Sequence, residues 1–179
     1  MSRNLNDLDS AFGVKIGALL QACKDTGYEM RPFFTLRTPL QQAGLWRQSR
    51  STFQITERID QLRESGADFL AGVIESAGPQ NGPQVTNAIP GLSWHQWGEA
   101  VDCFWLVEGR AEWSTRRKID SVNGYANYAQ LAADDNLTPG GHWTSFKDWP
   151  HIQLRAESSP ARLFSMAEID QQMRSRFGG

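Results

Sequence analysis

Apolar residues recur at spacings of three and four in several segments, the pattern of helices that bury one face. The first segment covers residues 5–25, where Phe12, Ile16 and Leu19 follow this spacing, and it ends before Gly27. Proline is favoured at a helix start, so Pro39 predicts a second helix that runs through Trp46. The same spacing predicts helices over residues 54–76, 114–133 and 160–176, with Gly66 as a candidate break in the first of these three.

Three short segments rich in aromatic and branched residues predict strands, at residues 31–37, 99–106 and 151–154. The glycine- and proline-rich residues 77–92 predict a long loop, a kind of segment that is often functional. Helices with a few short strands predict an α+β fold, in which a small antiparallel sheet packs with helices. Because the chain has only 179 residues and shows no internal repeat or separate binding module, we expect residues 1–179 to form a single domain.

Composition narrows the class of protein. With 40% hydrophobic and 21% charged residues, the chain is typical of a globular protein. A net charge of -2 argues against nucleic acid as the main partner, and no apolar run is long enough for membrane insertion. The first residues lack the apolar stretch of a Sec signal peptide, so we expect the protein to stay in the cytosol unless something else releases it. We also expect a monomer.

The two cysteines, Cys23 and Cys103, fit neither a CxxC motif nor a disulfide framework. Strand alternation places Cys103 on the opposite face from Asp102, so we expect it to be a buried thiol.

Two segments about 50 residues apart carry the candidate chemistry, Ser93–Asp102 and Lys147–Gln153. They offer two imidazoles, His95 and His151, and the carboxylate of Asp102, which needs a cation because it lies in an apolar strand. Three nitrogen and oxygen ligands with one open position are typical of catalytic zinc, although such ligands also accept manganese or cobalt. Asp148, three residues before His151, is a spare acid that could act as a general base.

Each of these residues also has an ordinary interpretation. Taken alone, either histidine is more often a hydrogen-bonded imidazole than a ligand, and Asp148 is equally well a turn residue. Glu99 lies four residues after His95, but strand alternation places it on the opposite face from Asp102. The four tryptophans near these segments could line a cleft or belong to the core: Trp94, Trp97, Trp143 and Trp149.

The combined pattern Ser-x-His-x-x-Gly-x-Ala-x-Asp followed by Asp-x-x-His resembles the zinc D-Ala-D-Ala carboxypeptidase family, which includes the VanX and VanY enzymes. Within it, the phage endolysins that act as L-alanyl-D-glutamate endopeptidases are the most similar branch. Two further segments agree, Arg37–Trp46 and Gly140–Asp148, so that the resemblance covers roughly residues 25–155.

The resemblance implies a hedgehog/D-Ala-D-Ala-peptidase-like fold and a role for each matching residue. It implies one Zn²⁺ per chain, held by His95, Asp102 and His151, with Asp148 as the catalytic acid/base. It also implies that Arg37 binds a substrate carboxylate and polarises the scissile carbonyl, a task that suits a charged bidentate guanidinium. The remaining residues expected at the substrate site are Gln42, Ser93 and His142. For His142, a partly exposed polar residue beside Trp143 is the more common interpretation.

These roles imply a zinc metallopeptidase, an endolysin that hydrolyses the L-Ala–D-Glu bond of peptidoglycan stem peptides. Carboxypeptidases of the family often have Glu where this chain has Asp148, which favours the endopeptidase. The alternatives are a D,D-carboxypeptidase or dipeptidase of the same family, and a non-catalytic wall-binding module with a structural zinc. We expect the enzyme to stay in the host cytoplasm until a separate membrane-permeabilising protein releases it to the wall.

Overall fold

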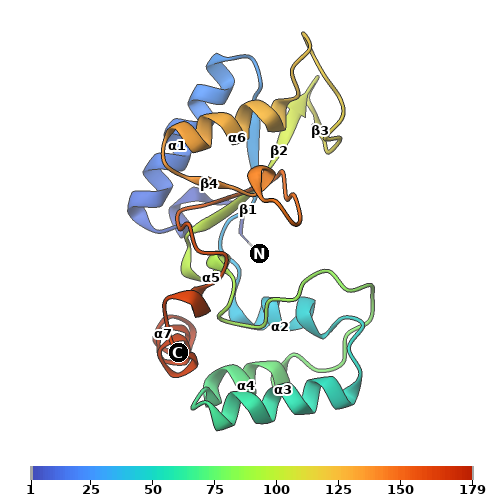
Figure 1. Cartoon of the computed structure of the whole chain (residues 1–179), viewed down its shortest axis with the longest axis vertical. Helices are drawn as coiled ribbons and strands as arrows, with labels where there is room; N and C mark the ends of the chain where they lie inside the picture. Colours follow the sequence, from blue (N-terminus) through green and yellow to red (C-terminus); the bar gives the residue numbers. More distant parts are fainter. Residues whose placement is uncertain (1, 179) are drawn as a thin grey trace. The chain divides into compact units, whose positions relative to one another are not determined.

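The structure is a computed structural model that describes residues 2–178 (Figure 1). These residues form seven α-helices and one five-stranded antiparallel sheet, which confirms the predicted α+β class. The chain divides into two compact units. The first comprises the residues up to Leu36 together with Trp97–Ala156, and the second comprises Arg37–Gln96 together with the residues from Glu157 on. The assignment of residues 1–179 to a single catalytic domain stays a prediction.

The first unit contains the sheet, in which β2 (Ala100–Val107) is the longest strand. The order is β1-β2-β5-β4, and β3 also pairs with β2. The bounds of the other strands are Met30–Phe34 for β1, Arg110–Glu112 for β3, Thr138–Pro139 for β4 and His151–Gln153 for β5. The three predicted strands are therefore present with slightly different ends. The two that were not predicted, β3 and β4, are only three and two residues long.

Two helices cover one face of this sheet, α1 (Ser10–Asp25) and α6 (Gly124–Asp134) (Figure 1). Every second residue of β2 points into the core that they form: Val101, Cys103, Trp105 and Val107. Cys103 is completely buried there, as predicted. The alternation of β2 leaves Asp102 and Phe104 on the opposite, partly exposed face.

Two predicted helices of the first unit have different starts. Residues 5–25 contain a short 3-10 turn, η1 (Leu5–Asp7), before α1, whose first N–H groups are capped by the Asp9 carboxylate. The prediction of one helix over 114–133 is wrong in its first half, because α6 begins only at Gly124. The Asn123 side chain accepts hydrogen bonds from two N–H groups of α6, and Asp120 and Ser121 have positive φ, which a helix does not allow.

The second unit is helical. It contains α2 (Pro39–Arg47), α3 (Thr52–Glu64), α4 (Asp68–Ser76), most of the one-turn helix α5 (Trp94–Trp97), and α7 (Met166–Phe177). Gly66, with φ of 76°, separates α3 from α4, so the predicted break is confirmed. A capping box of Ser165 and Glu168 starts α7, and the preceding residues Pro160–Arg162 form a 3-10 turn, η3, instead of the predicted helix.

Helices α4 and α7 of this unit are joined through a buried carboxylate. Asp170 accepts a hydrogen bond of 2.8 Å from the backbone N–H of Leu70, and both residues are buried. Residues 77–92 contain no helix or strand, as predicted. Within residues 2–178, no helix combines the length and apolar character needed to span a bilayer.

A pair of glycine substitutions tests the packing of the first unit. A Cβ atom on Gly124 would lie 2.5 Å from the buried Trp105 ring, whereas one on Gly17, in α1, would meet nothing within 4 Å. We expect Gly124→Ala to lower the free energy of unfolding by about 1–3 kcal/mol through overpacking. The matched Gly17→Ala should raise it by up to about 1 kcal/mol, because alanine favours a helix. Denaturant unfolding measures both changes, and equal effects would contradict the packing described here.

Candidate metal centre

Asp102 and His151 face each other across two paired strands. In the antiparallel register of β2 and β5 they are direct partners, so their side chains leave the sheet at neighbouring points. The Nδ1 atom of His151 lies 3.0 Å from Oδ1 of Asp102. Both side chains are largely buried, with exposed fractions of 10% and 17%. The register thus brings together two residues that are 49 positions apart in the sequence.

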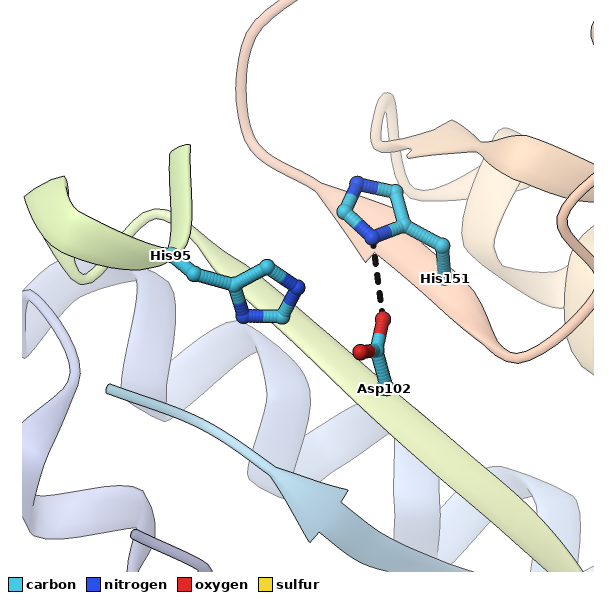
Figure 2. A group of neighbouring side chains, drawn as sticks. All are labelled: His95, Asp102 and His151. Carbon is cyan, nitrogen blue, oxygen red and sulfur yellow. Dashed lines mark hydrogen bonds and ion pairs between the residues drawn. The ribbon is translucent and has the colours of Figure 1, made fainter. Parts of the chain in front are cut away.

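His95 completes a group of three ligands (Figure 2). It lies on α5, which leads through Gly98 (φ of 72°) into β2, and its side chain is buried. One ligand atom from each of His95, Asp102 and His151 lies within 4.8 Å of the other two. Ligand atoms around a tetrahedral zinc, at bond lengths of about 2.0–2.2 Å, lie roughly 3.3–3.6 Å apart. The donor types and spacing therefore fit a zinc ion after small side-chain rotations.

Gln153, which the sequence analysis did not single out, orients His151. It is two residues further along β5, and its Oε1 lies 3.1 Å from Nε2 of His151. The Gln153 amide in turn donates to the carbonyl of Arg155 at 2.7 Å, which directs Oε1 towards the ring. This arrangement leaves Nδ1 as the ligand atom, in the way that hydrogen-bonded outer residues fix the tautomer of a ligating histidine. The only sequence signal for the role of Gln153 is its position two residues after His151, which places both side chains on the same face of the strand.

The charges around His151 favour its protonated form when no cation is bound. Burial lowers the pKa of His151, but the hydrogen bond and charge of Asp102 raise it, and the charge of Asp148 and the Gln153 hydrogen bond add to this. The net effect is a pKa above the ordinary value of 6.5. The negative charge that favours a proton here also favours a divalent cation.

Asp148 is held close to His151 by a tight turn. The carbonyl of Asp148 accepts a hydrogen bond from the N–H of His151 at 3.1 Å, and its N–H donates to Gly140 at 3.0 Å. A Cβ atom on Gly140 would lie 2.4 Å from the Asp148 carbonyl, and one on Gly141 would lie 2.5 Å from the Trp149 ring. The two glycines are therefore needed because any side chain there would displace the segment that carries Asp148.

Arg37 and Gln42 form part of a hydrogen-bonded network in the second unit. The Arg37 side chain donates to Oε1 of Gln42 at 2.9 Å, and its backbone N–H donates to the carbonyl of His95 at 3.3 Å. The same Oε1 accepts from Gln96, while Nε2 of Gln42 donates to Ala88 in the long loop. Gln42 is fully buried and its amide is engaged by the protein, so we interpret it as a residue that positions Arg37. That Arg37 binds substrate stays a prediction.

The other candidate residues lie as follows. Ser93 is partly buried and precedes α5, and its carbonyl accepts from the N–H of Gln96. His142 is exposed on the 3-10 turn η2 (Gly140–His142). Glu99 is paired with Arg155 through two bonds of 2.7 and 2.9 Å and does not belong to the three-ligand group.

The four tryptophans have different surroundings. The Trp143 ring lies 5.2 Å from the His151 ring, centroid to centroid, so this indole borders the candidate metal centre. Trp149 packs against the core of the first unit, and Trp94 is buried with its indole N–H bonded to the carbonyl of Glu157. Trp97 is partly buried.

Comparison with known families identifies one similar segment of the chain. The sequence model of a family described as D-alanyl-D-alanine carboxypeptidase matches residues 86–154. The matched segment contains the three candidate ligands and Asp148, while Arg37 and Gln42 lie before it. A comparison with curated proteins gave no match. The chain is similar to this family over that segment alone, and the similarity supports a metallopeptidase.

Removing the amide that orients His151 should weaken zinc binding. We expect Gln153→Leu to lower zinc affinity about 10- to 100-fold, since outer hydrogen-bond partners typically contribute that much. Competition with a chromophoric chelator measures the affinity. Gln130→Leu is the matched control, because Gln130 is exposed on α6 and bonds only to Asp134 among the contacts described. Equal affinities in the two variants would show that Gln153 does not support the metal centre.

Zinc binding should also depend on pH through His151. Because its pKa is raised above 6.5, protons begin to compete with zinc above that pH, and apparent affinity should fall by up to about tenfold per unit as the pH is lowered. In the metal-free protein the same shift stabilises the fold below pH 6.5, and this contribution is lost as pH rises through the raised pKa. Calorimetry in buffers of different ionisation enthalpy would detect the released proton. A constant affinity down to well below pH 6.5 would contradict this assignment.

Proposed function

We propose that this protein is a zinc-dependent endolysin that hydrolyses the L-Ala–D-Glu bond in the stem peptides of peptidoglycan. The observation that carries the proposal is the grouping of His95, Asp102 and His151, with Asp148 one tight turn before His151. A closed structural zinc site has four protein ligands, whereas three ligands beside an acid are typical of a hydrolytic site. The family match over residues 86–154 supports a peptidase of D-alanyl peptides or related wall peptides.

The chain's own residues divide the work of peptide hydrolysis. His95, Asp102 and His151 would hold the zinc, with Gln153 fixing the His151 ring. When bound, zinc supplies Lewis-acid chemistry, lowering the pKa of water from about 16 to roughly 7 and polarising a carbonyl. The Asp148 carboxylate accepts the proton of the attacking water and returns it to the leaving amine. Arg37, whose guanidinium is held by Gln42, binds a carboxylate of the substrate and favours the charge that develops at the scissile carbonyl.

The description of the matching family favours a second candidate, a D,D-carboxypeptidase that removes terminal D-Ala. Both substrates offer a carboxylate to Arg37, so this residue does not distinguish them. Aspartate in place of the glutamate common among carboxypeptidases supports the endopeptidase. A wall-binding module without activity would have no use for Asp148, which argues against that alternative. In the proposed setting a monomer with one Zn²⁺ reaches the wall through a separate membrane-permeabilising protein.

Muropeptide digestion tests the proposal and the role of Asp148 together. The zinc-loaded protein should release stem peptides with a new N-terminal D-Glu, detected by mass spectrometry and by the appearance of free amines. Asp148→Ala should keep one equivalent of zinc but lose about 100- to 10,000-fold in turnover, the usual contribution of one positioned acid/base.

The matched control is Asp134→Ala, because Asp134 is an exposed carboxylate on α6. Its turnover and zinc content should equal those of the parent. Loss of terminal D-Ala in place of stem release would favour the carboxypeptidase. An Asp148→Ala variant nearly as active as the parent would remove that residue from the mechanism.

A further inference from the structure

Four aromatic side chains form a continuous layer on the sheet face that carries Asp102. We call this set the aromatic platform: Phe33, Phe34, Phe104 and Trp113. The Phe33 ring lies 4.9 Å from Trp113 and 4.1 Å from Phe34, centroid to centroid. The Phe104 ring lies 5.8 Å from Trp113 and 6.5 Å from Phe33. These separations are typical of favourable aromatic pairs, so the four rings form one surface.

Strand register places this platform next to the candidate metal centre. Phe104 is two residues after Asp102 on β2, so the two side chains share a face and their Cα atoms are about 6.6–6.8 Å apart. Phe34 is the direct partner of Asp102 on β1. The register of β1 shifts between Pro32 and Phe34, and such a bulge redirects a side chain. Here the redirected residue is Phe33, whose ring contacts Phe104 and Trp113.

The platform is accessible and has a cationic edge. Trp113 is 46% exposed, and Phe33 and Phe104 are only partly buried, although the opposite face of the same strands is fully covered by helices. The guanidinium of Arg3 lies over the Phe33 ring at 5.2 Å from its centroid. A group of partly exposed aromatic residues with a polar edge is typical of a binding surface.

We propose that the aromatic platform binds the N-acetylmuramoyl sugar to which the stem peptide is attached, an inference that rests on the proposed function. One face of a pyranose ring consists of C–H groups, and it packs flat against an aromatic ring while its hydroxyls remain in water. Burial of this apolar face favours binding without requiring a deep pocket. Arg3 and the indole N–H of Trp113 offer donors to the sugar's oxygen atoms.

The length of substrate between the sugar and the cleaved bond favours the endopeptidase reaction. In a muropeptide only L-Ala and the lactyl group separate the scissile L-Ala–D-Glu carbonyl from the sugar, a reach of about 7 Å. That reach is comparable to the spacing of about 6.6–6.8 Å between the Cα atoms of Asp102 and Phe104 on an ideal strand. In D-Ala–D-Ala cleavage three more residues intervene, which places the sugar roughly 17 Å away when extended. With an extended stem peptide, a sugar bound beside the metal therefore favours cleavage of the bond next to L-Ala.

The test compares two substrates, the free stem peptide and the same peptide carrying N-acetylmuramic acid. The zinc-loaded protein should show a kcat/KM roughly tenfold higher for the muramoyl peptide, the size expected for one good stacking contact. Trp113→Ala should abolish this preference and leave hydrolysis of the free peptide within about twofold, while Trp113→Phe should retain most of it. The matched control is Val14→Ala, an exposed residue (75%) on α1, which covers the opposite face of the sheet.

A binding measurement separates this proposal from the proposed function. N-acetylmuramoyl-L-alanine contains the sugar but no scissile bond, so calorimetry with this compound needs no turnover. The parent and Trp113→Phe should bind it roughly tenfold more tightly than Trp113→Ala does. Equal affinities, or L-Ala–D-Glu cleavage with no preference for the muramoyl substrate, would overturn the sugar site and leave the function intact. Tight binding that depends on Trp113, without cleavage of either substrate, would support the sugar site and overturn the function.

Discussion

The pairing of Asp102 with His151 across β2 and β5 is the interaction on which the rest of the site depends. A carboxylate in this partly apolar setting is costly unless a positive group faces it, and the antiparallel register supplies the imidazole as its direct partner. The same strand holds the hydrophobic core on its other face through Val101, Cys103 and Trp105. The register of β2 thus determines both the site and the core. A shift of one residue would move the core side chains to the site face and Asp102 to the core face.

Neighbouring residues hold the side chains of the candidate site in position. Gln153 fixes the rotation of the His151 ring, and its own amide is fixed by the carbonyl of Arg155. The glycines at 140 and 141 let the backbone pass close beneath the segment that carries Asp148. In the second unit, Gln42 and Gln96 tie Arg37 and the long loop to helix α5, which carries His95. Within each unit, these residues are therefore held in place by protein contacts.

Much of this arrangement could be predicted from the sequence, because spacing and residue type carry the relevant physics. The short motif around His95 and Asp102 and the Asp-x-x-His segment contain the three candidate ligands that the structure brings within 4.8 Å of one another. Cys103 was expected in the core from alternation alone. Residues whose importance comes from register could not be found in this way. Gln153 and the platform acquire their neighbours from strand pairing, and the bulge at Phe33 has no local signature.

The errors in secondary structure have a similar cause. Residues 114–123 carry apolar positions at helical spacing, yet the Asn123 side chain caps α6 and the preceding residues turn back on themselves, with Ile119 paired to Val122. Local side-chain hydrogen bonds, and not the spacing of apolar residues, determined where the helix begins there. The same competition at Ser165 delayed the start of α7. Periodicity predicted that these helices exist, and capping chemistry determined where they begin.

The buried thiols of the first unit have a consequence for the environments that the protein can tolerate. Cys23 and Cys103 are both unpaired and fully buried, and burial raises the pKa of Cys23 to about 12 and that of Cys103 still further. Oxidation and disulfide exchange require an accessible thiolate, which neither residue offers. The described fold therefore contains no disulfide, and neither thiol is accessible to oxidation while the protein is folded.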